Sequence, residues 1–318
     1  MTMALEVQGL TKVFRRRGKD PVVAVREIGL QVQPGEVVGL LGPNGAGKTT
    51  TIKCILGLML ATGGSVRVFG RDIARHRSDA AREMSAVLEG SRNIYWRMTA
   101  AENLGFFTLL HGVPRHEAQP YNHRLLEVFG LADRKDVSVQ ELSAGMRQKV
   151  AVACALATRA SLVFLDEPTL GLDLETSHEL RRLLRELAAS EGRTIVLSSH
   201  DMAVVQDVCR RVVIMKEGRV VVDDSVANLL ALFRTRAYRF ALSDGCPDGL
   251  EQRLRERFTG VTMNPGRPFV VEVVLDRAED LYAIIEVLRA AGVLIDTITQ
   301  REPDLEEAFL RLMRGEGI

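Results

Sequence analysis

The sequence predicts an α/β fold with a mostly parallel β-sheet, followed by a small α+β domain. A glycine-rich loop separates the apolar run Val37–Leu41 from a helical pattern that begins after Gly47. Two further apolar runs, Leu162–Leu165 and Thr194–Ser198, are each followed by a helical pattern. This alternation of strand and helix is typical of a parallel sheet. The pattern changes after Asn228, where we expect a second domain to begin.

The composition is that of a globular protein with a hydrophobic core. Of the 318 residues, 46% are hydrophobic and 26% are charged, and a chain of this length can form one large or two medium domains. The 42 Lys and Arg nearly balance the 41 Asp and Glu, so we expect no nucleic-acid partner. The four cysteines are widely spaced, which predicts neither a zinc site nor disulfides. Since no run approaches the roughly 18–20 apolar residues that cross a bilayer, and the N-terminus lacks a signal pattern, the chain is expected in the cytosol.

Residues 1–40 alternate short strand-like runs with turn residues, which predicts an antiparallel β subdomain. A helix is expected over Thr50–Leu60, because a Thr-Gly-Gly turn ends the helical pattern, and Ser65–Phe69 returns as a strand. The strands expected before this helix are Leu5–Val7, Val22–Val25, Ile28–Val32 and Val37–Leu41.

Between about residues 90 and 160 the pattern is helical, which predicts a helical subdomain inserted into the sheet domain. Thr99 and Glu102 form a capping box before an apolar run. Pro120 is expected in the first turn of another helix, because proline is tolerated there. A third helix is expected over Met146–Thr158.

Residues 229–318 predict a small α+β domain beside the domain formed by residues 1–228. Its strands and helices are expected in the order βαββαβ with one further helix, which is the order of a ferredoxin-like domain. The expected elements are strand 238–242, helix 249–258, strands 261–263 and 269–275, helix 281–291, strand 294–299 and helix 305–313.

The glycine-rich loop matches the pattern GxxxxGK[ST] between a strand and a helix, the context in which this pattern predicts a phosphate-binding loop. Glycines let backbone N–H groups turn toward phosphate oxygens, Lys48 can reach the β- and γ-phosphates, and the Thr49 hydroxyl can bind Mg²⁺. A loop that only caps a helix would explain the glycines but not Lys48 and Thr49. The candidate nucleotide-binding residues are Gly42, Pro43, Asn44, Gly45, Ala46, Gly47, Lys48, Thr49 and Thr50.

A second motif is the apolar strand Leu162–Leu165, which is followed by Asp166 and Glu167. Four apolar residues imply a buried central strand, so Asp166 is expected at the carboxyl edge of the sheet, where it can hold the water shell of Mg²⁺ beside Thr49. Glu167 can then polarise an attacking water. A strand that simply ends would also explain the two acids. Together with the phosphate loop, however, they predict nucleotide hydrolysis.

A third motif, LSAGMRQ at Leu142–Gln148, places small residues at a helix N-terminus, which forms a second anion cradle. It resembles the LSGGQ signature of the ATP-binding cassette (ABC) ATPases, which are P-loop NTPases. The resemblance implies ATP and Mg²⁺ as cofactors. It also implies a homodimer in which the signature of one copy closes over the ATP in the phosphate loop of the other. Ser143 and Gly145 would meet phosphate there, whereas Ala144 and Met146 depart from the family pattern.

Further positions match the family in order between residues 4 and about 225. Asp173 resembles the D-loop residue, and His200 falls where the family places a histidine that contacts the γ-phosphate or the attacking water. Phe14 resembles the aromatic residue that stacks on adenine. Purely structural roles would also explain a histidine after a strand and a phenylalanine in a β-region. Glu89 stands where the family usually has a metal-ligating glutamine, so it is a further candidate metal ligand.

The resemblance implies the ATPase subunit of a transporter, attached to a separate permease at the inner face of the cell membrane. The C-terminal extension and the NGAGKTT and LSAGMRQ variants resemble bacterial export ATPases of the multidrug type, including daunorubicin-resistance ATPases. This implies export of a small hydrophobic compound, drug or lipid-like substrate. Two alternatives stay open. One is a non-transport ABC ATPase that acts on nucleic acid or ribosomes, and the other is a small-molecule P-loop kinase, in which LSAGMRQ would have no role.

Overall fold

The computed structural model divides into two compact units, Met1–Val226 and Ala227–Ile318, which are described separately below. The boundary predicted from the sequence lies after residue 228. The structure describes residues 2–15, 18, 20–88, 94–232, 236–243, 245, 247, 249–258, 260–275, 279–301 and 305–314.

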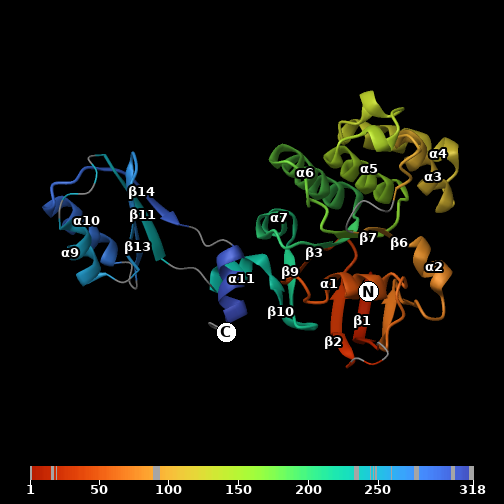
Figure 1. The fold of residues 1–318 in the computed structure, drawn as a ribbon, viewed down its shortest axis with the longest axis horizontal. Helices are drawn as coiled ribbons and strands as arrows, with labels where there is room; N and C mark the ends of the chain where they lie inside the picture. Colours follow the sequence, from red (N-terminus) through yellow and green to blue (C-terminus); the bar gives the residue numbers. More distant parts are fainter. Residues whose placement is uncertain are drawn as a thin grey trace. The chain divides into compact units, whose positions relative to one another are not determined.

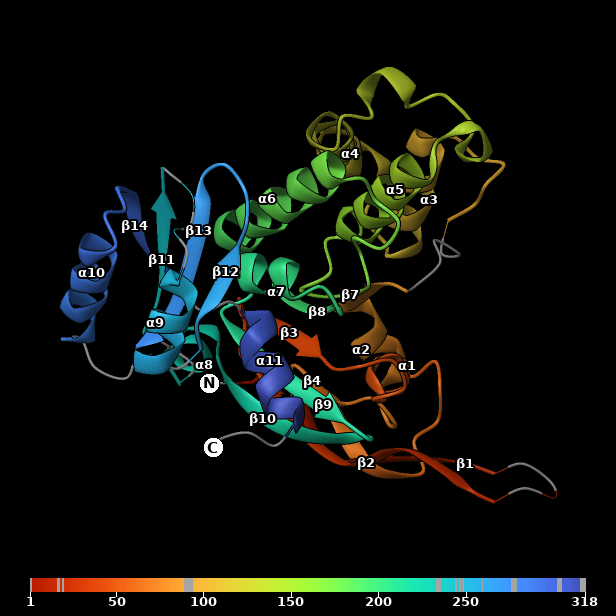
Figure 2. The same cartoon turned by 60° about the vertical axis from the view of Figure 1, so that its left-hand side comes forward.

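The first unit begins with a four-stranded antiparallel sheet in the order β2-β1-β4-β5. Its strands are β1 (Leu5–Phe14), β2 (Val22–Val32), β4 (Gly63–Val68) and β5 (Arg71–Asp72). The short runs expected before residue 33 merge into two long strands, which lie side by side as a hairpin (Figure 2). A register shift between Val7 and Leu10, with Gly9 at φ 58°, lets β1 continue through residues that are typical of a turn.

The central sheet of the first unit has six strands in the order β10-β9-β3-β8-β7-β6. They are β3 (Val37–Leu41), β6 (Met84–Val87), β7 (Leu162–Asp166), β8 (Thr194–Ser198), β9 (Arg211–Lys216) and β10 (Arg219–Ser225). All neighbours pair in parallel except β10, which is antiparallel to β9. Every residue of β3, β7 and β8 is buried. Because parallel strands end at the same edge, the residues that follow β3, β7 and β8 meet there.

Four helices accompany this sheet: α1 (Lys48–Ile55), α2 (Arg77–Arg82), α6 (Leu174–Glu191) and α7 (Met202–Val208). Helix α1 is shorter than the expected Thr50–Leu60. It starts directly after the phosphate loop and ends before Gly57, which adopts φ 67°, a conformation that commonly ends a helix. Two apolar residues of the expected helix, Leu58 and Leu60, lie beyond its end and are 62% and 81% exposed.

The helical subdomain consists of α3 (Ala100–Leu110), α4 (Arg115–Val128) and α5 (Ala144–Ala157), and it lies on one side of the central sheet (Figure 1). Both hydrogen bonds of the expected capping box at the start of α3 are present. Two 3₁₀ turns, Ala132–Arg134 and Val139–Glu141, connect α4 to α5. The expected position of Pro120 in a first turn is wrong. Helix α4 begins at Arg115, because the Pro114 carbonyl already accepts the first helical hydrogen bonds, and Pro120 lies in its interior.

The second unit contains an antiparallel sheet in the order β12-β13-β11-β14. After α8 (Val226–Leu232), its elements are β11 (Arg236–Leu242), α9 (Leu250–Arg257), β12 (Thr262–Asn264), β13 (Phe269–Leu275), α10 (Asp280–Ala290), β14 (Ile295–Arg301) and α11 (Leu305–Arg314). This is the order of strands and helices that the sequence predicts. Phe240 and Val271 of the sheet pack with Leu254 of α9 and Ile284 of α10 in one core, so both helices cover the same face of the sheet.

Candidate functional site

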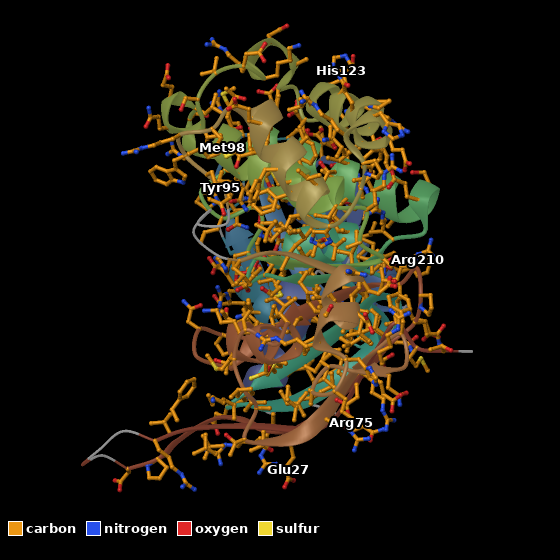
Figure 3. The ribbon with its side chains drawn as sticks, turned by 90° about the vertical axis from the view of Figure 1, so that its right-hand side faces the viewer. Glu27, Arg75, Tyr95, Met98, His123 and Arg210 are labelled. Atoms are coloured by element: carbon orange, nitrogen blue, oxygen red, sulfur yellow. The ribbon has the colours of Figure 1, made fainter. Side chains whose placement is uncertain are left out.

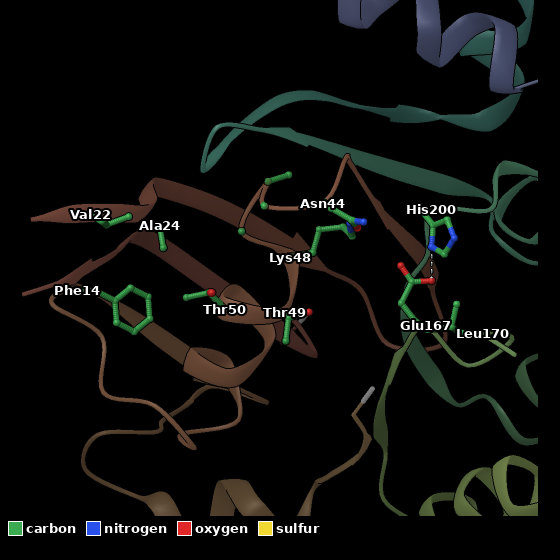
Figure 4. A pocket seen from close by; sticks show the side chains of 13 residues that line it. Phe14, Val22, Ala24, Asn44, Lys48, Thr49, Thr50, Glu167, Leu170 and His200 are labelled. Carbon is green, nitrogen blue, oxygen red and sulfur yellow. Dashed lines mark hydrogen bonds and ion pairs between the residues drawn. The ribbon is translucent and has the colours of Figure 1, made fainter. Parts of the chain in front are cut away.

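A cavity of about 560 Å³ lies where the β1–β2 hairpin, the loop after β3 and the end of β7 come together (Figure 4). It is apolar near the hairpin and polar at the carboxyl edge of the central sheet. Its lining residues are Phe14, Val22, Ala24, Asn44, Gly45, Ala46, Gly47, Lys48, Thr49, Thr50, Glu167, Leu170 and His200.

The loop between β3 and α1 forms the middle of this cavity. Gly47 precedes α1 at φ 100°, and a Cβ atom there would lie only 2.5 Å from the Ala24 carbonyl oxygen, so no larger residue fits. The Lys48 side chain is 7% exposed, and its Nζ donates hydrogen bonds to the carbonyl oxygens of Gly42 at 2.6 Å and Pro43 at 3.4 Å. A buried ammonium group beside the N-terminus of a helix is a site for phosphate.

Asp166, the last residue of β7, is 1% exposed and receives two hydrogen bonds. The Thr49 hydroxyl donates to its Oδ2 at 2.9 Å, and the Ser198 hydroxyl donates to its Oδ1. A hydroxyl and a carboxylate are oxygen ligands of the kind that Mg²⁺ prefers, and Mg²⁺ commonly completes its shell with phosphate and water. Among the described residues, no group of three or more His, Cys, Asp or Glu is placed to hold a metal. Thr49 and Asp166 therefore fit a magnesium ion that is shared with a bound nucleotide.

Glu167 adopts φ 50°, a backbone conformation that is costly for a residue other than glycine and that recurs at functional sites. Its N–H donates to the Ser198 carbonyl at 3.0 Å, which holds this conformation. Its Oε2 lies 2.9 Å from Nδ1 of His200 and 3.5 Å from the Ser199 hydroxyl. The Glu167 side chain is 10% exposed and that of His200 is 55% exposed. The arrangement can hold a carboxylate ready to accept a proton from water at the phosphate end of the cavity.

The apolar end of the cavity is formed by Phe14, Val22 and Ala24 (Figure 4). Phe14 is 36% exposed and lies opposite Val22 in the β1–β2 register. The Lys12 ammonium lies 5.2 Å from the centre of the Phe14 ring. An exposed ring with aliphatic neighbours offers a surface on which a nucleobase can stack. The cavity thus has an apolar end, a phosphate-binding middle and a carboxylate at its far end.

Ser143, Gly145 and Asp173 lie together but do not line this cavity. Ser143 caps α5, and its hydroxyl accepts the N–H of Met146 at 3.2 Å. A Cβ atom on Gly145 would lie 3.9 Å from Oδ2 of Asp173, so the starts of α5 and α6 are adjacent. Hydrogen bonds from Thr176 lower the pKa of the Asp173 carboxyl, which caps α6. One copy therefore carries the cavity and the signature as separate surfaces.

Glu89 lies outside the described residues. Conversely, the site contains residues that the motifs do not mark. Ser198 and Ser199 bond to the two acids from the end of β8. The Ser-Ser-His order after an apolar strand is the signal that could have identified them. Val22 could have been found only from the register of β1 and β2, since it carries no chemical signature of its own.

Comparisons with known proteins identify related chains. The family profile described as ABC transporter matches residues 25–170. The chain is 38% identical over 211 residues to the ABC transporter ATP-binding protein NatA of Bacillus subtilis (strain 168), a match that covers 66% of this chain and 85% of that protein. It is 34% identical to the methionine import ATP-binding protein MetN of Symbiobacterium thermophilum, over 98% of this chain and 97% of that protein. The fold also matches the dimeric, ADP- and Pi-bound structure of an ATP-binding cassette, at a TM-score of 0.63 and 25% identity, over 70% of this chain and 98% of the other.

Proposed function

Since this chain belongs to the ATP-binding proteins of ABC transporters, which hydrolyse ATP to power transport, we propose that it works as one of two facing copies attached to a separate permease. The observation that carries the proposal is that the nucleotide cavity and the signature residues lie on separate surfaces of one copy. The cavity holds Lys48, Thr49 and Glu167, whereas Ser143 and Gly145 lie outside it. A second copy can supply its own Ser143 and Gly145 to this cavity.

In this proposal each end of the cavity has a distinct task. Phe14 stacks on the base, and Lys48 moves its ammonium group from the loop carbonyls to the phosphates. Thr49 and Asp166 hold Mg²⁺, which when bound offsets negative charge on the phosphates. Glu167 accepts a proton from the attacking water.

In the same proposal His200 contacts both the Glu167 carboxylate and the γ-phosphate. Its Nδ1 lies 2.9 Å from Oε2 of Glu167 and so holds that carboxylate toward the cavity. The rest of its ring is exposed to the space where the γ-phosphate would lie. Closure on two ATP molecules would then move the permease, and hydrolysis would reset it.

A second, apolar cavity supports attachment of a permease. It has a volume of about 230 Å³ and lies among α1, α2, β6, α3 and α5. Phe107 and Leu110 of α3 line it, beside Leu56 and Leu58 after α1. An apolar cavity of this kind can receive an apolar side chain of a partner. Among the described residues, no helix is long and apolar enough to cross a bilayer. We place the chain at the membrane surface through its permease.

We propose export as the direction of transport, because the phosphate-loop and signature variants resemble those of export ATPases. None of the relatives named above is called a drug exporter, so the substrate stays open.

Import is the second candidate, and one observation favours it. The similarity to the methionine import protein covers 98% of this chain and so extends through the second unit. That unit has the βαββαβ order and the sheet order β12-β13-β11-β14 of a ferredoxin-like domain.

ATP trapping tests the ATPase proposal. In Glu167→Gln the carboxylate that takes the proton is lost, while the phosphate loop is intact. We expect ATP binding with hydrolysis reduced by at least a hundredfold, and accumulation of an ATP-bound dimer in size-exclusion chromatography. Lys48→Ala in the same background is the matched control, because loss of the ammonium group should weaken nucleotide binding and abolish the dimer. Normal turnover in Glu167→Gln would remove Glu167 as the base.

Vesicles distinguish export from import. The chain is isolated together with its membrane protein, and the complex is reconstituted into vesicles. ATP is supplied only on the side of the membrane that carries this chain. Accumulation of a hydrophobic reporter on the side opposite to the cassette supports export. Accumulation of an external solute on the cassette side supports import instead.

A further inference from the structure

Arg147 lies between the signature residues and an exposed tryptophan. Its guanidinium carbon lies 5.4 Å from the centre of the Trp96 ring, and its Nη1 donates a hydrogen bond to the Leu142 carbonyl. Leu142 directly precedes Ser143, which caps α5. We propose that Arg147 is a positioning residue that links the surface at Trp96 to Ser143, so that the permease adjusts the signature through this contact. The inference rests on the proposed function.

The backbone beneath Trp96 is bonded to the segment that leads into the signature. The Trp96 carbonyl accepts hydrogen bonds from the Gln140 N–H at 2.9 Å and from the Ser138 hydroxyl at 3.0 Å. The Met98 carbonyl accepts the Val139 N–H at 3.0 Å. A displacement of the chain at Trp96 is therefore passed to residues 138–140, a few residues before Ser143.

The other side of the same segment is fixed to α3. The Asn103 side chain is completely buried, and its Oδ1 accepts the Tyr95 N–H at 2.8 Å. Its Nδ2 lies within 3.0 Å of the carbonyl oxygens of Tyr95 and Thr99. Tyr95 and Met98 lie together on one side of the helical subdomain (Figure 3). Residues 95–99 are thus held as one piece, which moves with the start of α3 rather than deforming.

The surface that this piece presents is suited to an apolar partner segment. The Trp96 and Tyr95 side chains are about half exposed. The Tyr95 ring meets that of Phe106 edge to face, with centroids 4.9 Å apart, and Phe107 of the same helix lines the apolar cavity proposed for the permease. A permease segment seated there would press on Trp96 as well as on the cavity.

Arginine suits this position for a geometric reason. The face of its planar guanidinium stacks on an aromatic ring while its edge donates hydrogen bonds. A lysine keeps the charge but lacks the planar group that stacks on the ring while its edge donates hydrogen bonds. Arg147→Lys therefore separates the positioning role from the charge.

The test uses the full chain in the Glu167→Gln background, with ATP-dependent dimer formation as the measurement. Arg147→Lys and Trp96→Leu should each raise the ATP concentration for half-maximal dimerisation roughly two- to fivefold. The double variant should show no larger effect than either single one, because both remove the same contact. Affinity of the monomer for a fluorescent ATP analogue should be unchanged.

Arg159→Lys is the matched control. Arg159 also stacks over an aromatic ring, Tyr121 at 5.1 Å, and also donates to a backbone carbonyl, that of Glu117. It contacts no signature residue in these interactions, so its replacement should leave dimerisation unchanged. Trp96→Phe retains an aromatic ring. It should therefore need an ATP concentration for half-maximal dimerisation close to that of the parent, unlike Trp96→Leu.

Trp96 is also the only tryptophan of the chain, so tryptophan fluorescence, excited selectively over the four tyrosines, reports on it alone. ATP-dependent dimerisation should change its emission in the Glu167→Gln parent and change it less in Arg147→Lys. Three outcomes would each overturn the inference. They are equal dimerisation in the parent and the variants, additive effects in the double variant, and a loss of dimerisation in Arg159→Lys equal to that in Arg147→Lys. Absence of ATP-dependent dimers in the parent itself would overturn the two-copy assembly and, with it, this link.

Discussion

At the scale of single residues, the site depends on how two neighbouring acids are held. Asp166 is almost fully buried and accepts hydrogen bonds from Thr49 and Ser198. Glu167 is turned toward the cavity by a left-handed backbone conformation. Because Asp166 and Ser198 are register partners on β7 and β8, the sheet itself brings the serine to the acid.

Ser198→Ala should weaken magnesium binding without removing a proposed ligand. The Asp166 carboxylate would lose the group that orients its Oδ1, and loss of such an orienting partner commonly costs tenfold or more in metal affinity. We expect the Mg²⁺ concentration for half-maximal ATP hydrolysis to rise about tenfold. Ser199→Ala is the control, because Ser199 lies near Glu167 instead. An unchanged Mg²⁺ requirement in Ser198→Ala would show that Thr49 alone orients Asp166.

The site residues that the sequence identifies are those whose chemistry is visible in a local pattern. Lys48 and Thr49 follow the loop after β3, Asp166 ends β7, and each carries a distinctive side chain. Lys48 and Thr49 line the same cavity, and the Thr49 hydroxyl donates a hydrogen bond to Asp166. Val22 enters the site only because β1 and β2 pair in a particular register, which no local pattern encodes. The Ser-Ser-His order marks Ser198, but its pairing with Asp166 depends on the register of β7 and β8.

At the scale of elements, a capping motif of two residues locates a helix start correctly, whereas a single proline does not. The capping box at Thr99 and Glu102 is found as the sequence predicts. The expected end of the first helix at Leu60 is wrong, because Gly57 at φ 67° ends α1 early, and Leu58 and Leu60 beyond it are exposed. Pro120 shows that tertiary packing outweighs the cost of one missing hydrogen bond inside α4.

Removing the cap of α3 should destabilise the first unit. In Thr99→Ala the Glu102 N–H loses the hydroxyl that it donates to at 3.1 Å. The expected loss is about 1 kcal/mol in the free energy of unfolding, measured by urea denaturation. Thr99→Ser keeps the hydroxyl and should retain most of the stability. Equal stability of Thr99→Ala and the parent would mean that water replaces the cap without cost.

At the scale of the whole molecule, the division into two units follows from two separate hydrophobic cores. Phe164 and Leu40 belong to the core of the first unit, and Phe240 and Leu254 belong to that of the second. The change of pattern after Asn228 leads us to expect a domain boundary there, and the two units divide after Val226. The registers of the strands depend on contacts between distant residues and could not be predicted in the same way.

Two cores predict two unfolding steps, of which only one responds to nucleotide. A non-hydrolysable ATP analogue at about one hundred times its dissociation constant should stabilise the first unit by about 2.7 kcal/mol. Its transition in differential scanning calorimetry should shift by on the order of 5–10 °C, while that of the second unit stays in place. A single transition, or equal shifts of both, would contradict independent cores.

The contact between Gly47 and Ala24 has a consequence for redesign of this cassette. Ala24 borders the apolar end of the cavity, and its carbonyl oxygen leaves room for nothing larger than hydrogen at Gly47. A change to β2 intended to accept a different base would therefore shift the loop that grips the phosphates. The preference for a base and the binding of phosphate are therefore coupled through this contact. A library of variants that changes β2 must also vary the phosphate loop.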